Sequence, residues 1–223
     1  MPQVLEAGVR PGDKLAEYNV VITGFGPFGP HLVNASSEVV RALKCKKYPT
    51  NWHPVFVEDM PVIYKHVYEA VPKLWEEHKP KLMVHLGVAR DTSVVLLEQR
   101  AVNKISRACT DVAGSCPTDD VIDSSYCDAY CCTTLDLNSV CAAVRDDQTM
   151  DGLVAAVSQD AGQYLCNYAY FLSLQQDPQR TVFIHIPRID EPYSREQLTN
   201  AIHKIIVLLI DQIDVLGASQ TSE

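Results

Sequence analysis

A cysteine and a histidine stand where two predicted elements meet one edge of a sheet, and together they could form an activated nucleophile. Cys166 falls in or just after the first turn of a helix predicted over residues 163–175. The helix dipole and free N–H groups there favour a thiolate and can stabilise an oxyanion. His185 lies at the end of a strand predicted over residues 181–186. A cysteine beside a histidine base is the minimal activated thiol, so the pair predicts nucleophilic catalysis.

Each of these residues also has a purely structural interpretation. A cysteine on a helix beside Leu165 is typical of a small core residue. His185 shares a strand face with Phe183 and is equally compatible with a buried, hydrogen-bonded role. His85, near the end of a strand predicted over residues 82–86, is a rival for the role of base. The sequence alone leaves these alternatives open.

Glu98 places a charge inside the apolar run 94–102. A carboxylate in such a run needs a partner, because burying an unpaired charge is costly. Arg100 is the structural candidate for that partner. The functional candidate is the imidazole N–H of His185, since a carboxylate can hold a catalytic histidine in the right tautomer and orientation.

A glycine-rich turn, Gly24-Phe-Gly-Pro-Phe-Gly29, follows a strand predicted over residues 19–25 and matches the G-x-G-x-x-G pattern of dinucleotide-binding turns. Pro27 removes a backbone N–H from the loop, and Phe25 and Phe28 add bulk where a pyrophosphate needs close approach. The next helix also begins too far along the chain for its N-terminus to meet a phosphate. These features favour an aromatic-walled small-molecule pocket over a nucleotide site or a plain structural turn.

The elements that must position these residues alternate between strand and helix. Further strands are predicted over residues 54–60 and 153–158, with strand-like runs at 94–97 and 101–102, and further helices from residue 36, over 62–78 with Pro72 as a kink or restart, and over 136–145. This alternation predicts a single-domain α/β open sandwich, with a mostly parallel twisted sheet and helices on both faces. Function in such sheets sits at the carboxyl ends of the strands. We expect a flexible leader over residues 1–18, the domain over 19–216 and a disordered tail over 217–223.

The last predicted helix carries the clearest start signal in the chain. Ser194-Arg-Glu-Gln197 matches a capping box, in which the first and last side chains each bond the other residue's backbone N–H. One apolar stripe follows at helical spacing, made of Leu198, Ile202, Ile205, Leu209 and Ile213.

Composition restricts the class of protein and its partners. The 223 residues carry a net charge of −9, with an isoelectric point near 5.2, which argues against nucleic acid and anionic membranes as partners. No apolar stretch approaches the ~20 residues of a membrane span, and the first residues lack the apolar core of a secretory signal. We therefore expect a cytoplasmic protein with reduced thiols.

Six of the eight cysteines fall between Cys109 and Cys141. Their spacings lack the paired C-x2-C knuckles of structural zinc sites, so free thiols on a loop are the favoured interpretation and a zinc site is the alternative. A zinc assay on purified protein would separate the two.

Several segments together carry a resemblance to a known family. From about residue 19 to residue 215 the chain resembles pyroglutamyl-peptidase I (pyrrolidone-carboxylate peptidase), in its animal more than its bacterial form. The matching segments, in order, are Val21-Ile-Thr-Gly-Phe-Gly-Pro-Phe-Gly29, Val33-Asn-Ala-Ser36, Val84-His-Leu-Gly-Val88, Ser158-Gln-Asp-Ala-Gly-Gln-Tyr-Leu-Cys166 and Phe183-Ile-His-Ile-Pro187.

The resemblance implies a cysteine exopeptidase that removes N-terminal pyroglutamate from peptides through a thioacyl intermediate, without metal or cofactor. Its Cys-His-Glu triad falls on Cys166, His185 and Glu98. Its lactam site falls on Phe25, Phe28, Asn34 and the backbone at Val88. Two positions depart from the family pattern, namely Gln163, where an arginine is usual, and Ser106, where animal members tend to have an aromatic residue. The competing interpretations are a catalytically silent relative that binds pyroglutamyl peptides and a nucleotide-binding α/β protein that uses residues 24–29.

Overall fold

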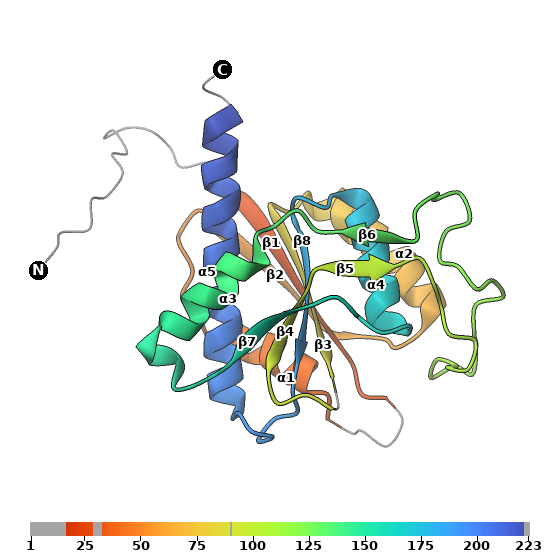
Figure 1. Ribbon diagram of the computed structural model, residues 1–223, viewed down its shortest axis with the longest axis horizontal. Coiled ribbons are helices and arrows are strands. Elements are labelled where there is room, and N and C mark those ends of the chain that lie inside the picture. The colour runs from red at the N-terminus through yellow and green to blue at the C-terminus, as the bar shows by residue number, and fades with distance from the viewer. Residues whose placement is uncertain (1–16, 29–32, 90, 221–223) are drawn as a thin grey trace, which may run out of the picture.

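A central sheet flanked by helices forms the body of the molecule in the computed structural model, which describes residues 17–28, 33–89 and 91–220 (Figure 1). Most of the expected leader lies outside the described residues. The elements in chain order are β1 (Tyr18–Phe25), α1 (Ala35–Leu43), β2 (Trp52–Met60), α2 (Tyr64–His78), β3 (Leu82–Val88), β4 (Val95–Glu98), β5 (Arg100–Val102), β6 (Tyr130–Cys132), α3 (Leu137–Asp146), a 3-10 turn (Gln148–Met150), β7 (Ala155–Ser158), α4 (Leu165–Gln176), β8 (Thr181–Ile186) and α5 (Arg195–Gln220).

The six-stranded sheet has the order β2-β1-β3-β8-β4-β7. The first four of these strands are parallel to one another. β4 runs antiparallel to β8, and β7 runs parallel to β4. A separate antiparallel ribbon joins β5 to β6. The prediction of a single-domain α/β fold with a mostly parallel sheet is confirmed, and the reversal at β4 is a feature that the sequence pattern did not reveal.

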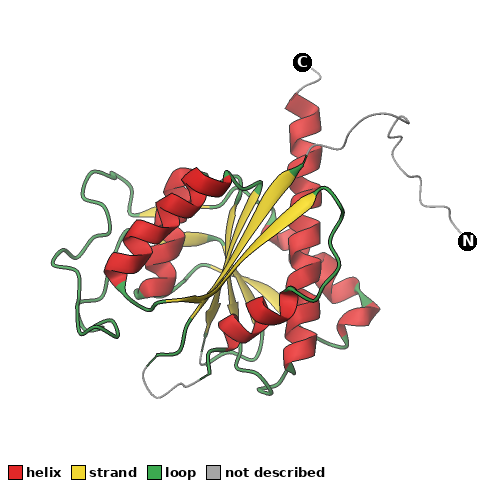
Figure 2. Ribbon diagram, turned by 180° about the vertical axis from the view of Figure 1, so that it is seen from behind, coloured by secondary structure: helices red, strands yellow, loops and turns green. Residues whose placement is uncertain are grey.

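Helices cover both faces of the sheet, as the view from behind also shows (Figure 2). α1, α3 and α5 pack on one face, and α2 and α4 pack on the other. Alternation along β8 divides its side chains between the two layers. Val182, Ile184 and Ile186 join the α5 layer, whereas Phe183 joins the α4 layer. His185 therefore belongs to the α4 side, as its alternation with Phe183 predicted.

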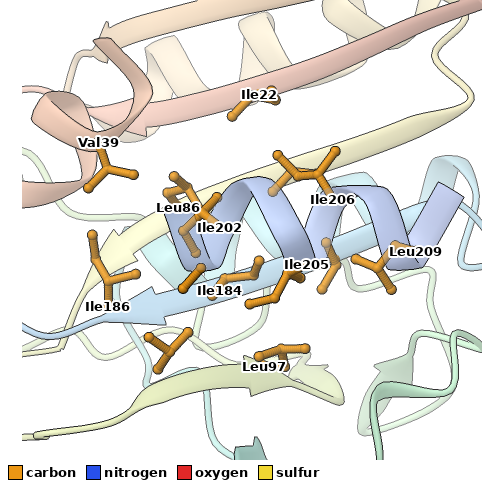
Figure 3. Close-up of a cluster of buried hydrophobic side chains, with 14 of the residues drawn as sticks. Ile22, Val39, Leu86, Leu97, Ile184, Ile186, Ile202, Ile205, Ile206 and Leu209 are labelled. Atoms are coloured by element: carbon orange, nitrogen blue, oxygen red, sulfur yellow. The ribbon is translucent and has the colours of Figure 1, made fainter. Parts of the chain in front are cut away.

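The α5 layer is the larger apolar core (Figure 3). The predicted stripe is confirmed, because its first four members are fully buried and Ile213 packs partly buried against them. The capping box is confirmed as well. The Ser194 N–H donates to Gln197 Oε1 at 3.0 Å, and the Gln197 N–H donates to Ser194 Oγ at 3.2 Å. These bonds fix the start of the helix that closes this face.

Two elements extend beyond the expected limits of the domain. β1 starts at Tyr18, inside the expected leader, and α5 continues to Gln220, inside the expected tail. No proline interrupts the helix after Leu216, so its hydrogen-bond ladder runs on. α2 continues through Pro72 as one helix. The carbonyl that this proline leaves without a donor belongs to Tyr68, whose side chain is 59% exposed, so solvent can replace the lost bond.

Within the described ranges, no helix is long and apolar enough to cross a membrane.

The α5 layer gives a stability prediction. Ile205 is fully buried, so Ile205→Ala is expected to lower the free energy of unfolding by about 2–5 kcal/mol through lost burial and a cavity. Val215→Ala on the same helix serves as the control, because Val215 is 66% exposed, and its change should stay within about 0.5 kcal/mol. Urea unfolding followed by circular dichroism measures both. Equal losses in the two variants would contradict the assignment of this face as the core.

Candidate active site

His185 and Glu98 are joined across the antiparallel pair formed by β8 and β4. His185 lies opposite Leu96 and Glu98 lies opposite Phe183, so the two functional residues are diagonal neighbours on one face of the sheet. His185 Nδ1 is 2.7 Å from Glu98 Oε1. Because a carboxylate oxygen can only accept, the imidazole Nδ1–H is the donor, which leaves Nε2 for other partners.

The structural partner proposed for Glu98 is engaged elsewhere. The Arg100 Nε–H donates to the carbonyl oxygen of Gln159 at 2.9 Å, and its guanidinium stacks over the Tyr130 ring. Glu98 is fully buried. Of the two partners considered for this carboxylate, the structure pairs it with His185.

Cys166 reaches the same place from the helix layer above the sheet. It is the second residue of α4, and its thiol lies close enough to His185 to raise the pKa of that ring. Gly87 on β3 lies next to His185 in the sheet. A Cβ atom at Gly87 would lie 3.0 Å from Cys166 Sγ and 2.8 Å from the Phe183 ring, so only glycine leaves room for the thiol there.

The surroundings of His185 favour its protonated form. Burial lowers its pKa, but the hydrogen bonds and charges of Cys166 and Glu98 outweigh burial and raise the pKa to about 10. An opposite charge within a few ångströms has this effect on a histidine. The contacts with Cys166 and Glu98 therefore favour the imidazolium form of His185.

His85, the rival base, is a core residue. It is fully buried and its Nδ1 lies 2.7 Å from Thr23 Oγ1. Burial lowers its pKa to about 3, so the ring is neutral at physiological pH. It stacks on Phe183 from β3. A group in this position has a packing role.

The start of α4 offers backbone donors beside the thiol. The first N–H groups of a helix have no acceptor within the helix. Tyr164, the N-cap residue, makes no side-chain capping bond to them. Cys166 lies in this first turn, so these groups can stabilise an oxyanion that forms on a carbonyl attacked by its sulfur.

A cavity of about 640 Å³ opens at this edge of the sheet. Cys166, His185 and Glu98 line it, and so do Phe28 and Val88. The remaining wall comes from the end of β3, from β4 and from two loops, and comprises Ala89, Leu96, Ala108, Cys109, Thr110, Asp160, Ala161, Gly162 and Tyr164. The volume accommodates a lactam ring and part of a peptide beyond it.

Two of the expected pocket residues lie elsewhere. Asn34 lines a neighbouring cavity of about 200 Å³, which shares Phe28 and Val88 with the larger one. Phe25 is 4% exposed and packs in the α4 layer of the core, where it lines neither cavity. Phe28 therefore lines the cavity, whereas Phe25 is part of the hydrophobic core.

The glycine-rich turn is held by α1 and β2. The Asn34 side chain caps α1 by accepting from the Ser36 N–H, and its amide donates to the Gly26 carbonyl at 3.0 Å. Ser36 Oγ accepts from the Phe25 N–H at 3.0 Å. At Gly24 a Cβ atom would come within 2.8 Å of the Ser36 carbonyl oxygen, which explains this glycine by close packing on α1.

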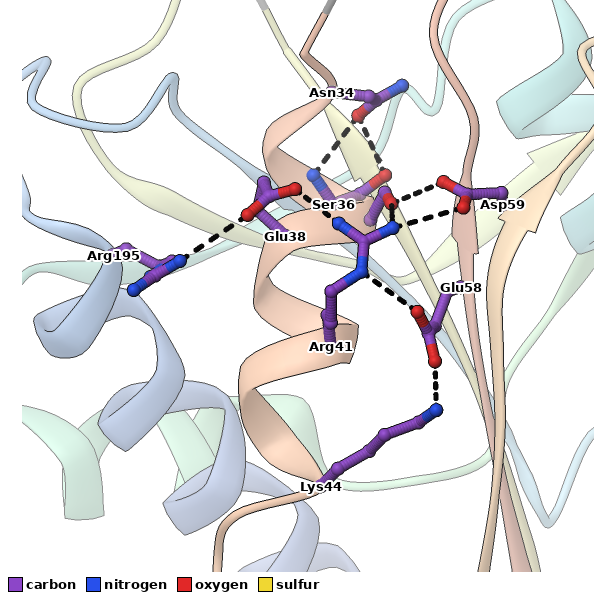
Figure 4. Close-up of polar contacts among 9 residues, drawn as sticks. Asn34, Ser36, Glu38, Arg41, Lys44, Glu58, Asp59 and Arg195 are labelled. Carbon is purple, nitrogen blue, oxygen red and sulfur yellow. Dashed lines mark hydrogen bonds and ion pairs between the residues drawn. The ribbon is translucent and has the colours of Figure 1, made fainter.

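Ion pairs between α1 and β2 lie next to the glycine-rich turn (Figure 4). Arg41 of α1 pairs with Glu58 and Asp59 at the end of β2. Asp59 also accepts from the Ser37 hydroxyl at 2.5 Å. These contacts fix α1 against β2, and with it the loop that carries Phe28.

Sequence reasoning missed the steric role of Gly87 and the wall at residues 108–110. The first could be suspected from a glycine at a strand end, whereas no sequence signal indicated the second. All eight cysteines are free thiols. In the part of the chain that the structure describes, no three histidine, cysteine or acidic side chains gather as metal ligands would.

The chain is similar to proteins of one peptidase family. A family model described as pyroglutamyl peptidase matches residues 18–207. Human pyroglutamyl-peptidase 1 is 38% identical over 201 residues, which cover 87% of this chain and 91% of the human protein. The pyrrolidone-carboxylate peptidase of Pyrococcus furiosus is 32% identical over 177 residues, covering 77% of this chain and 82% of that protein.

The fold agrees with a solved structure of the same kind. Pyrrolidone carboxyl peptidase from Thermococcus litoralis superposes with a TM-score of 0.77 at 26% identity, covering 88% of this chain and 95% of that chain. The higher identity to the mammalian relative fits the animal form of the family. Sequence and fold together show that the chain belongs to the pyroglutamyl peptidase family.

Proposed function

We propose that this protein is a cysteine exopeptidase that releases N-terminal pyroglutamate from peptides, with Cys166 as nucleophile, His185 as base and acid, and Glu98 as the group that orients His185. The observation that carries the proposal is the buried hydrogen bond from His185 Nδ1 to Glu98 Oε1, made by a histidine that lines the same cavity as Cys166. Family membership supplies the substrate class.

The chemistry of the substrate suits the cavity. A pyroglutamyl group is a small, neutral lactam without an ammonium group, so an apolar wall with a few polar backbone groups fits it better than a carboxylate would. Phe28 offers an aromatic face in the cavity that Cys166 lines. We expect the lactam to lie against this ring, with its scissile carbonyl at the thiolate.

The reaction then proceeds in two steps. The Cys166 thiolate attacks the carbonyl carbon, and N–H groups in the first turn of α4 stabilise the oxyanion. His185 gives its proton to the nitrogen of the departing amine as the C–N bond breaks, which leaves a thioester on Cys166. His185 next takes a proton from water, whose oxygen attacks the thioester and releases 5-oxoproline and the free thiolate.

Turnover of a fluorogenic pyroglutamyl amide tests the proposal directly. Cys166→Ala is expected to abolish turnover while leaving the folded state and lactam binding nearly intact, because it removes only the nucleophile. Cys45→Ala is the control, since Cys45 is an exposed free thiol that does not line the cavity, and its turnover should equal that of the wild type. A well-folded but inactive Cys45→Ala beside an active Cys166→Ala would refute the assignment.

Glu98→Gln separates orientation from binding. It keeps the shape but removes the charge that stabilises the imidazolium, so kcat should fall about 10²–10⁴-fold with little change in KM. Glu98 raises the pKa of His185. Its loss should therefore lower that pKa and move the alkaline limb of the kcat/KM profile to lower pH. Glu69→Gln, an exposed carboxylate on α2, is the control. An unchanged kcat and an unchanged pH dependence of kcat/KM in Glu98→Gln would show that Glu98 has only a structural role.

Substrate discrimination tests the aromatic wall. Phe28→Ala should weaken binding of the lactam by about 1–3 kcal/mol, because the ring lies in the cavity wall. Phe25→Ala should act mainly on the free energy of unfolding, since that ring is in the core. The wild-type protein should prefer pyroglutamyl over prolyl amides by about 10⁴ or more, because the prolyl group lacks the carbonyl and carries an ammonium. Comparable kcat/KM values for the two amides would exclude the proposed lactam site.

A further inference from the structure

The loop between β5 and β6 forms one wall of the cavity that Cys166 and His185 line. Ala108, Cys109 and Thr110 line the cavity that also holds Cys166 and His185, and we call these three residues the 108–110 wall. They belong to the segment between β5 and β6, which carries no strand or helix at this point. Something other than secondary structure must therefore hold them in place.

We propose that Asp111 is a positioning residue for substrate binding, because its buried carboxylate holds the 108–110 wall. This inference rests on the proposed function of the cavity. Asp111 is 5% exposed. Its Oδ2 accepts from the Tyr64 N–H at 3.1 Å, and its Oδ1 accepts from the N–H groups of Ala113 and Ser115, both at 2.9 Å.

The bond to Tyr64 connects the wall to a fixed part of the fold. Tyr64 is the first residue of α2, and the N-cap residue of that helix, Ile63, makes no side-chain capping bond. Asp111 thus supplies from a distant loop the acceptor that an N-cap side chain usually provides. A negative charge at a helix N-terminus is also favourable. The loop is thereby attached to a helix packed on the sheet.

One side-chain and one backbone hydrogen bond complete the attachment on either side of Asp111. The Tyr164 hydroxyl donates to the Thr110 carbonyl at 3.0 Å, and the Val112 N–H donates to the Val62 carbonyl at 3.1 Å. Tyr164 is the N-cap residue of α4, the helix that carries the nucleophile. The wall therefore bridges the starts of α2 and α4.

The two departures from the family pattern meet at the same loop. The Ser106 N–H donates to the Gln163 carbonyl at 3.0 Å. This bond joins backbone atoms, so it needs neither an aromatic residue at 106 nor an arginine at 163. Both departures are compatible with an ordered wall.

Apolar packing contributes little to the 108–110 wall itself. Its three residues are exposed and Val112 is 52% exposed, whereas Ile105, earlier in the loop, is buried in the core. The Asp111 carboxylate accepts three of the hydrogen bonds that hold this part of the loop, so its loss should loosen the wall. Glu98, His185 and Cys166 stand on β4, β8 and α4, outside the loop. Release should therefore weaken substrate binding and leave the chemical step in place.

Steady-state kinetics with pyroglutamyl dipeptides and the fluorogenic amide tests the inference in the full-length protein. Asp111→Ala should raise KM at least tenfold and leave kcat within threefold. Asp111→Asn, which keeps one acceptor oxygen, should fall between this variant and the wild type and serves where Asp111→Ala folds poorly. Asp119→Asn is the matched control, because Asp119 is an exposed aspartate of the same segment. Its kinetics should equal those of the wild type.

Amide hydrogen exchange provides a second readout that needs no turnover. The amides of Tyr64, Ala113 and Ser115 should exchange faster in Asp111→Ala than in the control. Faster exchange with an unchanged KM would overturn the inference, since the wall would be free without effect on the substrate. Unchanged exchange, or a fall in kcat at constant KM, would overturn it too. A wild-type protein inactive on all pyroglutamyl substrates would refute the proposed function, and exchange would still decide whether Asp111 anchors the loop.

Discussion

The hydrogen bond between His185 and Glu98 joins two strands of the central sheet at the candidate active site, so the site depends directly on the fold. Glu98 is fully buried, and within the described part of the chain its second oxygen, Oε2, has no hydrogen-bond partner. A buried carboxylate without compensation is strongly destabilising, so this residue depends on the histidine beside it. The bond forms because β4 pairs directly with β8 in a register that places the two residues diagonally on one face.

Strand β8 also contributes side chains to both buried layers of the molecule. Along β8 the odd-numbered residues face α4 and the even-numbered residues face α5. The α5 side is an aliphatic core, whereas the α4 side near the strand ends holds His185, Phe183 and the thiol of Cys166. Glycine is also required at position 87, because a side chain there would collide with the Cys166 sulfur and the Phe183 ring. Both faces of the sheet therefore contribute buried apolar side chains, whereas His185, Glu98 and Cys166 gather on the α4 side alone.

Much of this arrangement could be predicted from the sequence because its signals are local. Alternation along residues 181–186 assigned His185 to the side of Phe183, and Ser194 with Gln197 marked the start of α5. The partner of Glu98 could not be chosen locally, since Arg100 is close in sequence and His185 is 87 positions away. The position of β4 beside β8 in the sheet, and the register of that pair, decide between them. The positions of Phe25 and Asn34 likewise depend on how the turn packs against α1 and β2.

The proposed mechanism forms a covalent thioester on one sulfur among the eight cysteines. Rapid mixing with a pyroglutamyl amide, acid quenching and mass spectrometry of the digested protein would detect this intermediate. We expect a mass increase of one pyroglutamyl group on the peptide that contains Cys166, and none on the peptide that contains Cys109. A pyroglutamyl adduct on any other cysteine, or product formation with no adduct under conditions where thioester hydrolysis limits the rate, would contradict the central claim.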